Sequence, residues 1–186
     1  MEHVWFFEQW QGLQLRDVRQ QLLSFSTELK PLGDMSVRDL CCLAKNDWIP
    51  VGLYVFTKGD RIIYAGKTHG RSFQERMLSH LDHRMPIPGS PHLAQLVQSI
   101  SKKDNITAEE AVQKVMNMKI VWLPVPDLGR GKEYHKRLIA TVERRLLWHK
   151  CLDPLYNSPR VKRNDHYSLK GERYQLEESF NLGREM

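Results

Sequence analysis

Two short apolar runs, residues 53–57 and 61–66, are rich in β-branched and aromatic side chains, and turn-forming residues 58–60 separate them. This pattern predicts a β-hairpin. If residues 58–60 form a three-residue loop, Tyr54 lies directly opposite Tyr64 on one face of the sheet. A two-residue loop would place the two tyrosines on opposite faces. We expect the three-residue loop.

Helical periodicity and capping signals predict helices on both sides of this hairpin. Their expected ranges are 13–29, 36–45, 72–82, 92–101, 107–117 and 131–150, and residues 119–124 read as a third strand. In the last helix Leu138, Val142 and Leu146 form an apolar stripe, and Glu143 borders it. The elements together predict an α+β fold, with a small three-stranded antiparallel sheet flanked by helices and an N-terminal helical extension.

The charge of the chain is concentrated in its middle part. Residues 1–50 hold 5 Lys and Arg against 7 Asp and Glu, residues 51–157 hold 17 against 10, and residues 158–186 hold 6 against 5. A basic surface of this kind favours a nucleic acid partner, whose affinity would fall with salt. The alternative for each residue is an ordinary solvated helix face. The expected DNA contacts are Arg71, Lys136, Arg137, Arg144 and Arg145.

Composition narrows the class of protein further. No apolar run approaches the eighteen or so residues that a transmembrane helix needs, and the first residues are acidic and aromatic, which argues against a membrane span and against secretion. Cys41, Cys42 and Cys151 show no metal-ligand spacing. We therefore expect reduced thiols and a cytoplasmic protein.

Two glycine–tyrosine triplets and four later polar residues follow one another in a particular order along the chain. Gly52-Leu53-Tyr54 and Tyr64-Ala65-Gly66 form two triplets, and Arg76 and His80 follow at a helical spacing of four. Glu143 and Asn157 come later. The order resembles the signature of the GIY-YIG endonuclease superfamily, with Leu53 and Ala65 in place of its isoleucines.

This resemblance covers residues 51–159, which we interpret as the nuclease domain, between an extension at 1–50 and a charged tail at 160–186. The interval between the second triplet and the arginine is longer than in compact members of the superfamily. We choose Arg76 over Arg71 because only Arg76 stands at helical spacing from His80.

The resemblance implies roles for these residues. Glu143 would bind Mg²⁺, with Mn²⁺ as a substitute, and a single carboxylate suits a largely hydrated Mg²⁺. Arg76 would hold the non-bridging phosphate oxygens. Asn157 would bond to the backbone and fix the site.

Tyr54 is implied as the general base. Only about a thousandth of a tyrosine with pKa near 10 is ionised at pH 7, and lowering that pKa by two units takes roughly 2.7 kcal/mol. Burial alone would raise the pKa. Tyr64 and Lys67 are the expected activators or phosphate contacts, and His80 the expected phosphate or proton-transfer partner.

The implied activity is Mg²⁺-dependent hydrolysis of duplex DNA, as in the restriction-type or defence nucleases of the superfamily. The alternatives are a structure-specific or nicking repair nuclease, and a non-catalytic DNA-binding module of the same fold. Because one active site cuts one strand, we also expect a homodimer, formed through the apolar N-terminal residues Trp5, Phe6, Phe7 and Trp10.

Overall fold

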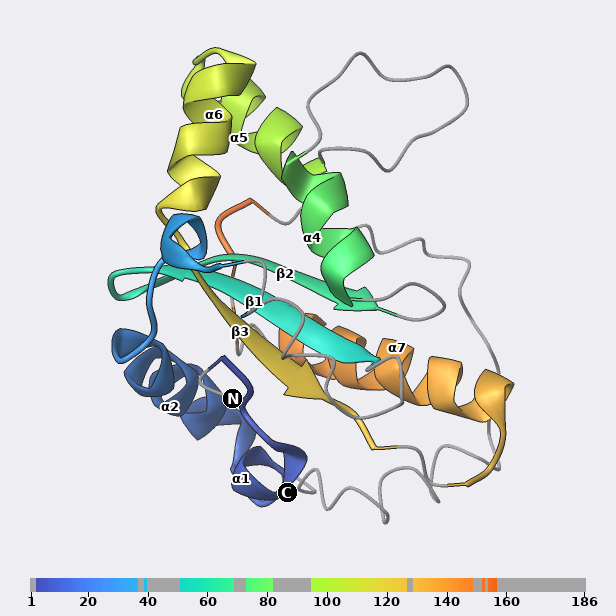
Figure 1. The fold of residues 1–186 in the computed structure, drawn as a ribbon. Helices are drawn as coiled ribbons and strands as arrows, with labels where there is room; N and C mark the ends of the chain where they lie inside the picture. Colours follow the sequence, from blue (N-terminus) through green and yellow to red (C-terminus); the bar gives the residue numbers. More distant parts are fainter. Residues whose placement is uncertain are drawn as a thin grey trace.

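The centre of the molecule is a three-stranded antiparallel sheet with the strand order β2-β1-β3 (Figure 1). The strands are β1 (Gly52–Lys58), β2 (Arg61–Thr68) and β3 (Lys119–Pro124). The computed structural model describes residues 3–36, 39, 51–68, 73–81, 95–126, 129–148, 152 and 154–156. Within them the α+β class and the three-stranded antiparallel sheet are confirmed.

The register of the hairpin differs from our prediction. Lys58 pairs with Arg61, so the loop has two residues, and its Gly59 has a φ of 58° at the first central position, which type II′ turns reserve for glycine. A β-bulge follows, because Thr57 pairs with Ile62 whereas the preceding residue of β1 pairs with Tyr64.

The bulge returns the two tyrosines to the same face of the sheet, whereas a two-residue loop alone would have placed them on opposite faces. Ile63 is the extra residue on β2, and it shifts the alternation of side chains by one position. Tyr54 therefore pairs with Gly66, and Tyr64 pairs with Phe56, but both tyrosines lie on the same face of the sheet. The predicted register is wrong, and the predicted proximity of the two tyrosines holds.

Each face of the sheet is covered by its own set of helices (Figure 1). One core contains Leu53, Val55 and Leu123 from the sheet, and it is closed by α1 (Phe7–Trp10), α2 (Leu15–Thr27) and α7 (Lys132–Trp148). The other contains Tyr54 and Phe56, and it is closed by η1 (Leu32–Asp34), α4 (Phe73–Leu81), α5 (Gln95–Asp104) and α6 (Ala108–Met116).

The helices begin and end where local signals place them, within a few residues of the predicted ranges. Thr107 and Glu110 form a capping box at the start of α6, with the Glu110 amide donating to the Thr107 hydroxyl at 3.2 Å. The apolar stripe of α7 is buried, as the periodicity predicted. The short helix α1 was not predicted. The helix expected at 36–45 and the tail at 160–186 lie largely or wholly outside the described residues.

Both outer strands have backbone partners beyond the sheet. At β3, Val4 forms a parallel bridge with Trp122, whose amide donates to the His3 carbonyl at 2.8 Å. At β2, the amides of Leu155 and Tyr156 donate to the carbonyls of Ile62 and Ile63, at 3.2 and 2.9 Å. The sheet edges are therefore covered by segments from opposite ends of the sequence.

Two of the four N-terminal aromatic residues belong to the core of their own chain, whereas Phe6 is exposed and Phe7 is half-buried. Trp5 and Trp10 are buried, and Val18 of α2 shares a core with Leu53. The side chains of Trp5 and Trp10 are thus unavailable for the dimer interface that the sequence suggested. Searching the described residues for a helix that could span a membrane finds none.

Candidate active site

Tyr54 and Tyr64 stack on one another on the sheet face that α4 covers. Their ring centroids are 6.2 Å apart with an interplanar angle of 30°, and their hydroxyls are hydrogen-bonded. Tyr54 is fully buried, whereas Tyr64 is only half-buried. Tyr64 is therefore the member of the pair that solvent or a substrate can reach.

Gly66 provides the space that the Tyr54 ring occupies. The two residues are paired across β1 and β2, and a Cβ atom at Gly66 would lie 2.8 Å from Tyr54 Cε2 and closer still to the hydroxyl. Such a contact is shorter than carbon atoms tolerate, so the ring requires glycine at this position. The last residue of the second triplet thus shapes the site without contributing a functional group.

His80 connects α4 to the tyrosine pair. Its Nε2 lies 2.7 Å from the Tyr54 hydroxyl, and its side chain is buried. Burial, with a smaller contribution from the charge of Arg76, lowers the pKa of His80 to about 3, so the imidazole is neutral near pH 7. Its Nδ1 has no hydrogen-bond partner among the described residues.

One assignment of the protons gives every hydroxyl in this group a partner. His80 Nε2–H donates to the Tyr54 oxygen, and the Tyr54 hydroxyl donates to the Tyr64 oxygen. The unpartnered Nδ1 then carries only a lone pair and no buried proton. In this arrangement a chain of hydrogen bonds runs from the buried His80 of α4 outward to the half-buried Tyr64.

Both tyrosines are neutral in this environment. Burial raises the pKa of Tyr54 well above its ordinary value, and neighbouring Tyr64 and Glu143 add to the rise while Arg76 opposes it. Burial also raises the pKa of Tyr64, and Glu143 adds to the rise, but Arg76 and the hydrogen bond from Tyr54 act in the opposite direction. Of the two, Tyr64 therefore has the surroundings better suited to a phenolate.

Lys67 and Glu143 form an ion pair beside the tyrosines. Lys67 Nζ lies 2.6 Å from a carboxylate oxygen of Glu143, and the side chains are 28% and 21% exposed. Lys67 pairs with Leu53 and so lies on the sheet face that α7 covers, where Glu143 reaches it. The site thus contains groups from both faces of the sheet, next to the edge strand β2.

The metal ligands available here are few. The described residues contain no cluster of three or more His, Cys, Asp and Glu side chains that could hold an ion. Among the predicted site residues that the structure describes, Glu143 offers a hard, partly exposed carboxylate, which fits an ion such as Mg²⁺ that keeps most of its water ligands. An ion at Glu143 would compete with the ammonium group of Lys67 for the same oxygens.

The remaining predicted residues are distributed around this centre. Arg76 is half-buried on α4, and its charge acts on both tyrosines and on His80. Asn157 and Arg71 lie outside the described residues. The predicted DNA contacts on α7 are exposed or half-buried, namely Lys136, Arg137, Arg144 and Arg145.

A polar cluster that the sequence did not indicate holds the segment after α7. The Tyr156 hydroxyl donates to Asp104 at 2.7 Å, and Lys103 donates to the Leu155 carbonyl at 2.7 Å and lies over the Tyr156 ring. Lys114 pairs with the same aspartate at 2.9 Å. These contacts join residues 52 positions apart, so no local pattern could have revealed them.

Set beside known proteins, the chain matches no family model, no curated protein and no solved structure.

Proposed function

We propose that this chain is a Mg²⁺-dependent GIY-YIG-type endonuclease that hydrolyses phosphodiester bonds in duplex DNA, in a restriction or defence role. The observation that carries the proposal is the convergence of residues distant in sequence. Tyr54, Tyr64 and His80 share one group of hydrogen bonds and ring contacts, and the Lys67–Glu143 ion pair lies beside it. Residues without a common function would not be expected both to follow the order of the triplet signature along the chain and to lie together in the fold.

The chemistry follows from the properties of each group. Arg76 supplies a planar cation that can hold two non-bridging phosphate oxygens. A divalent ion bound at Glu143 would supply charge stabilisation at the phosphate and the leaving oxygen. When Glu143 binds the ion, Lys67 loses its partner and becomes free to contact the phosphate.

The tyrosine pair is the proposed base. Tyr54 by itself is fully buried, so a proton taken from water enters through Tyr64. A phenolate on Tyr64 would accept the hydrogen bond that Tyr54 donates, and it would lie in the field of Arg76. Tyr54 thus acts through its neighbour, and His80 holds the Tyr54 hydroxyl in the required orientation.

The proposal is tested by DNA cleavage with Mg²⁺, on supercoiled plasmid and on unmethylated genomic DNA. We expect discrete fragments with the wild type and none with Glu143→Ala or Tyr64→Phe. Glu133→Ala is the matched control, because Glu133 is an exposed glutamate of the same helix whose nearest cation, Lys136, is 3.9 Å away. If Glu133→Ala also abolished cleavage, the loss in Glu143→Ala would not support Glu143 as the metal ligand.

Other outcomes distinguish the alternatives. Nicking of the plasmid without discrete genomic fragments favours a structure-specific or nicking repair nuclease. Salt-sensitive DNA binding without any cleavage by the wild type favours a non-catalytic binding module.

A double-strand break made in one binding event needs two active sites, so we also propose a homodimer on DNA. Its interface must use surfaces other than Trp5 and Trp10, which are buried. Sedimentation of Glu143→Ala with a duplex should give a mass of two chains, and a single chain that still makes double-strand breaks in one event would contradict this.

We further propose a cytoplasmic protein whose 3 cysteines are reduced. Thiol titration of the denatured protein, purified without reductant, should find all of them free.

A further inference from the structure

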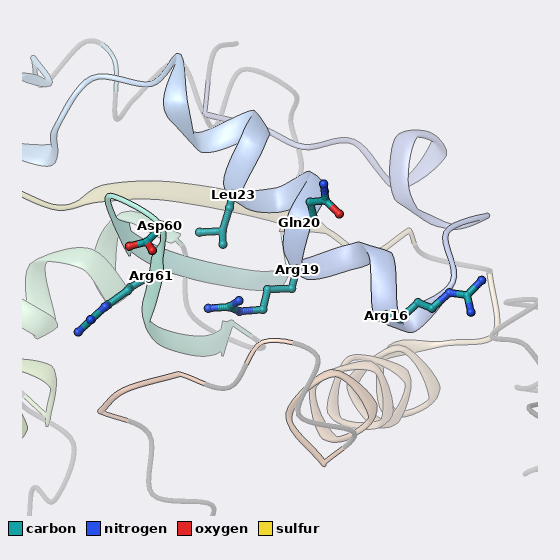
Figure 2. Close-up of a pocket in the computed structure, with 6 residues that line it drawn as sticks. All are labelled: Arg16, Arg19, Gln20, Leu23, Asp60 and Arg61. Carbon is teal, nitrogen blue, oxygen red and sulfur yellow. The ribbon is translucent and has the colours of Figure 1, made fainter.

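An open hollow of about 490 Å³ lies between α2 and the β1–β2 turn (Figure 2). Its lining is polar apart from one leucine, and consists of Arg16, Arg19, Gln20, Leu23, Asp60 and Arg61. Sites for small molecules are lined mostly by apolar and aromatic side chains and enclose their ligand. The composition of this hollow points instead to an extended anionic partner that passes across the surface.

Two of its arginines are available to such a partner. Arg19 and Arg61 are exposed, and neither forms an ion pair within the described part of the chain. Arg16 lies 3.8 Å from the carboxylate of Asp17, and in Figure 2 it points away from the other two. Asp60 also lines the hollow and offsets part of its charge.

The fold places the two arginines at the same hollow from elements that are distant in the sequence, and in Figure 2 the Arg61 side chain extends away from Arg19. Arg19 belongs to α2, and Arg61 opens β2 after the two-residue loop. Figure 2 shows the Arg19 side chain extending from α2 toward the hairpin end that carries Arg61. The first fifty residues have a net negative charge, so the sequence gives no sign of a basic site here.

The hollow lies along the same strand as the candidate active site and on the face of the sheet that holds the Lys67–Glu143 ion pair, whereas the two tyrosines and His80 lie on the other face. Arg61 begins β2, and Lys67 follows six residues later, which at about 3.3 Å per residue corresponds to roughly 20 Å. Both α2, which lines the hollow, and α7, which carries Glu143, cover this face.

We propose that Arg19 and Arg61 bind backbone phosphates of the same duplex, away from the bond that is cut. Arginine suits this role because its planar fork matches phosphate geometry. Such contacts set the register of the protein on DNA without reading its sequence. This inference rests on the proposed function, since it assumes that duplex DNA is the substrate.

The test measures duplex binding in the Glu143→Ala background, where DNA is bound but not cut. Fluorescence anisotropy with a 30-base-pair duplex at several salt concentrations gives the slope of log K against log salt. Each lost phosphate contact should reduce the magnitude of that slope by about 0.9. Arg19→Ala and Arg61→Ala should each do so, on duplexes of any sequence, and the double variant should lose about 1.8.

Lys102→Ala is the control, since Lys102 is an exposed cation of α5 on the opposite face of the sheet, and its slope should match that of the parent. Circular dichroism should be unchanged in every variant, because the substituted side chains are exposed.

The outcomes separate the two proposals. If the parent binds duplex and the double variant keeps the parent slope, the hollow does not contact DNA, and the proposed function is untouched. If the parent binds no duplex, the proposed function itself fails. If the double variant loses binding to a polyglutamate probe while its duplex slope is unchanged, the hollow is a site for acidic peptides.

Discussion

The close approach of Tyr54 to Gly66 makes Gly66→Ala a sharp test of the site. An alanine Cβ would lie 2.8 Å from Tyr54 Cε2, and the ring cannot move aside freely because Phe56, Phe73 and His80 surround it at centroid distances of 5.5 to 6.3 Å. Either the ring or the β2 backbone must shift to accommodate the methyl group.

The cost can be worked out from these contacts. Overpacking of a full core costs about 1–3 kcal/mol. Displacing the ring also breaks the 2.7 Å bond from Tyr54 to His80, which contributes about 1 kcal/mol. Replacing glycine stiffens the unfolded chain and returns about 0.4–1 kcal/mol. We therefore expect Gly66→Ala to lower the free energy of unfolding by about 1–3 kcal/mol.

Urea denaturation measures this change, and Gly12→Ala provides the matched control. No atom lies within 4 Å of the Cβ position at Gly12, and its φ is not in the left-handed region, so its substitution should leave stability unchanged or slightly higher. The reasoning is refuted if Gly66→Ala is as stable as the control. Tyr54→Leu in the Gly66→Ala background should recover part of the loss, because it removes the atoms that the methyl group meets.

Two further predictions concern pH and the segment after α7. The pKa of His80 in the folded chain is lowered to about 3, so near pH 6 the imidazole binds a proton only in the unfolded chain. The free energy of unfolding should therefore have its full value above about pH 6.5 and fall as the pH decreases below it. The wild type should lose about 2 kcal/mol more than His80→Asn between pH 8 and pH 5, and parallel stability curves would contradict this. Tyr156→Phe removes the bond to Asp104 and should cost about 1 kcal/mol in urea denaturation. Tyr134→Phe, whose hydroxyl only accepts a 3.4 Å bond from Arg130 at an exposed site, should cost far less, and equal losses would rule out a special role for the Tyr156 contact.

Local patterns predicted the elements of this fold well because their determinants are local. The Thr107 capping box and the apolar stripe of α7 each lie within one helix, and β3 coincides with a continuous run of four buried apolar residues and its two flanking positions. The hairpin register failed because the bulge at Ile63 depends on how the strand fits the two cores, and a loop of two or three residues looks alike in sequence.

The site was predictable only in part for the same reason. The order of polar residues indicated that Tyr54 and Tyr64 would meet, and they do. It did not indicate that Lys67 would pair with Glu143, because the strand and the helix that carry them are 76 residues apart and only their packing brings them together.

The backbone bridge between residues 3–5 and β3 has a consequence for the order in which the chain acquires its structure. The partner of His3 and Trp5 is Trp122, so during synthesis these residues must wait for more than a hundred others before they can pair. Without residues 3–5, β3 would present an open edge, which is the kind of surface on which chains associate with one another. Removing residues 1–5 should therefore favour aggregation, in addition to taking the buried side chains of Val4 and Trp5 out of the core.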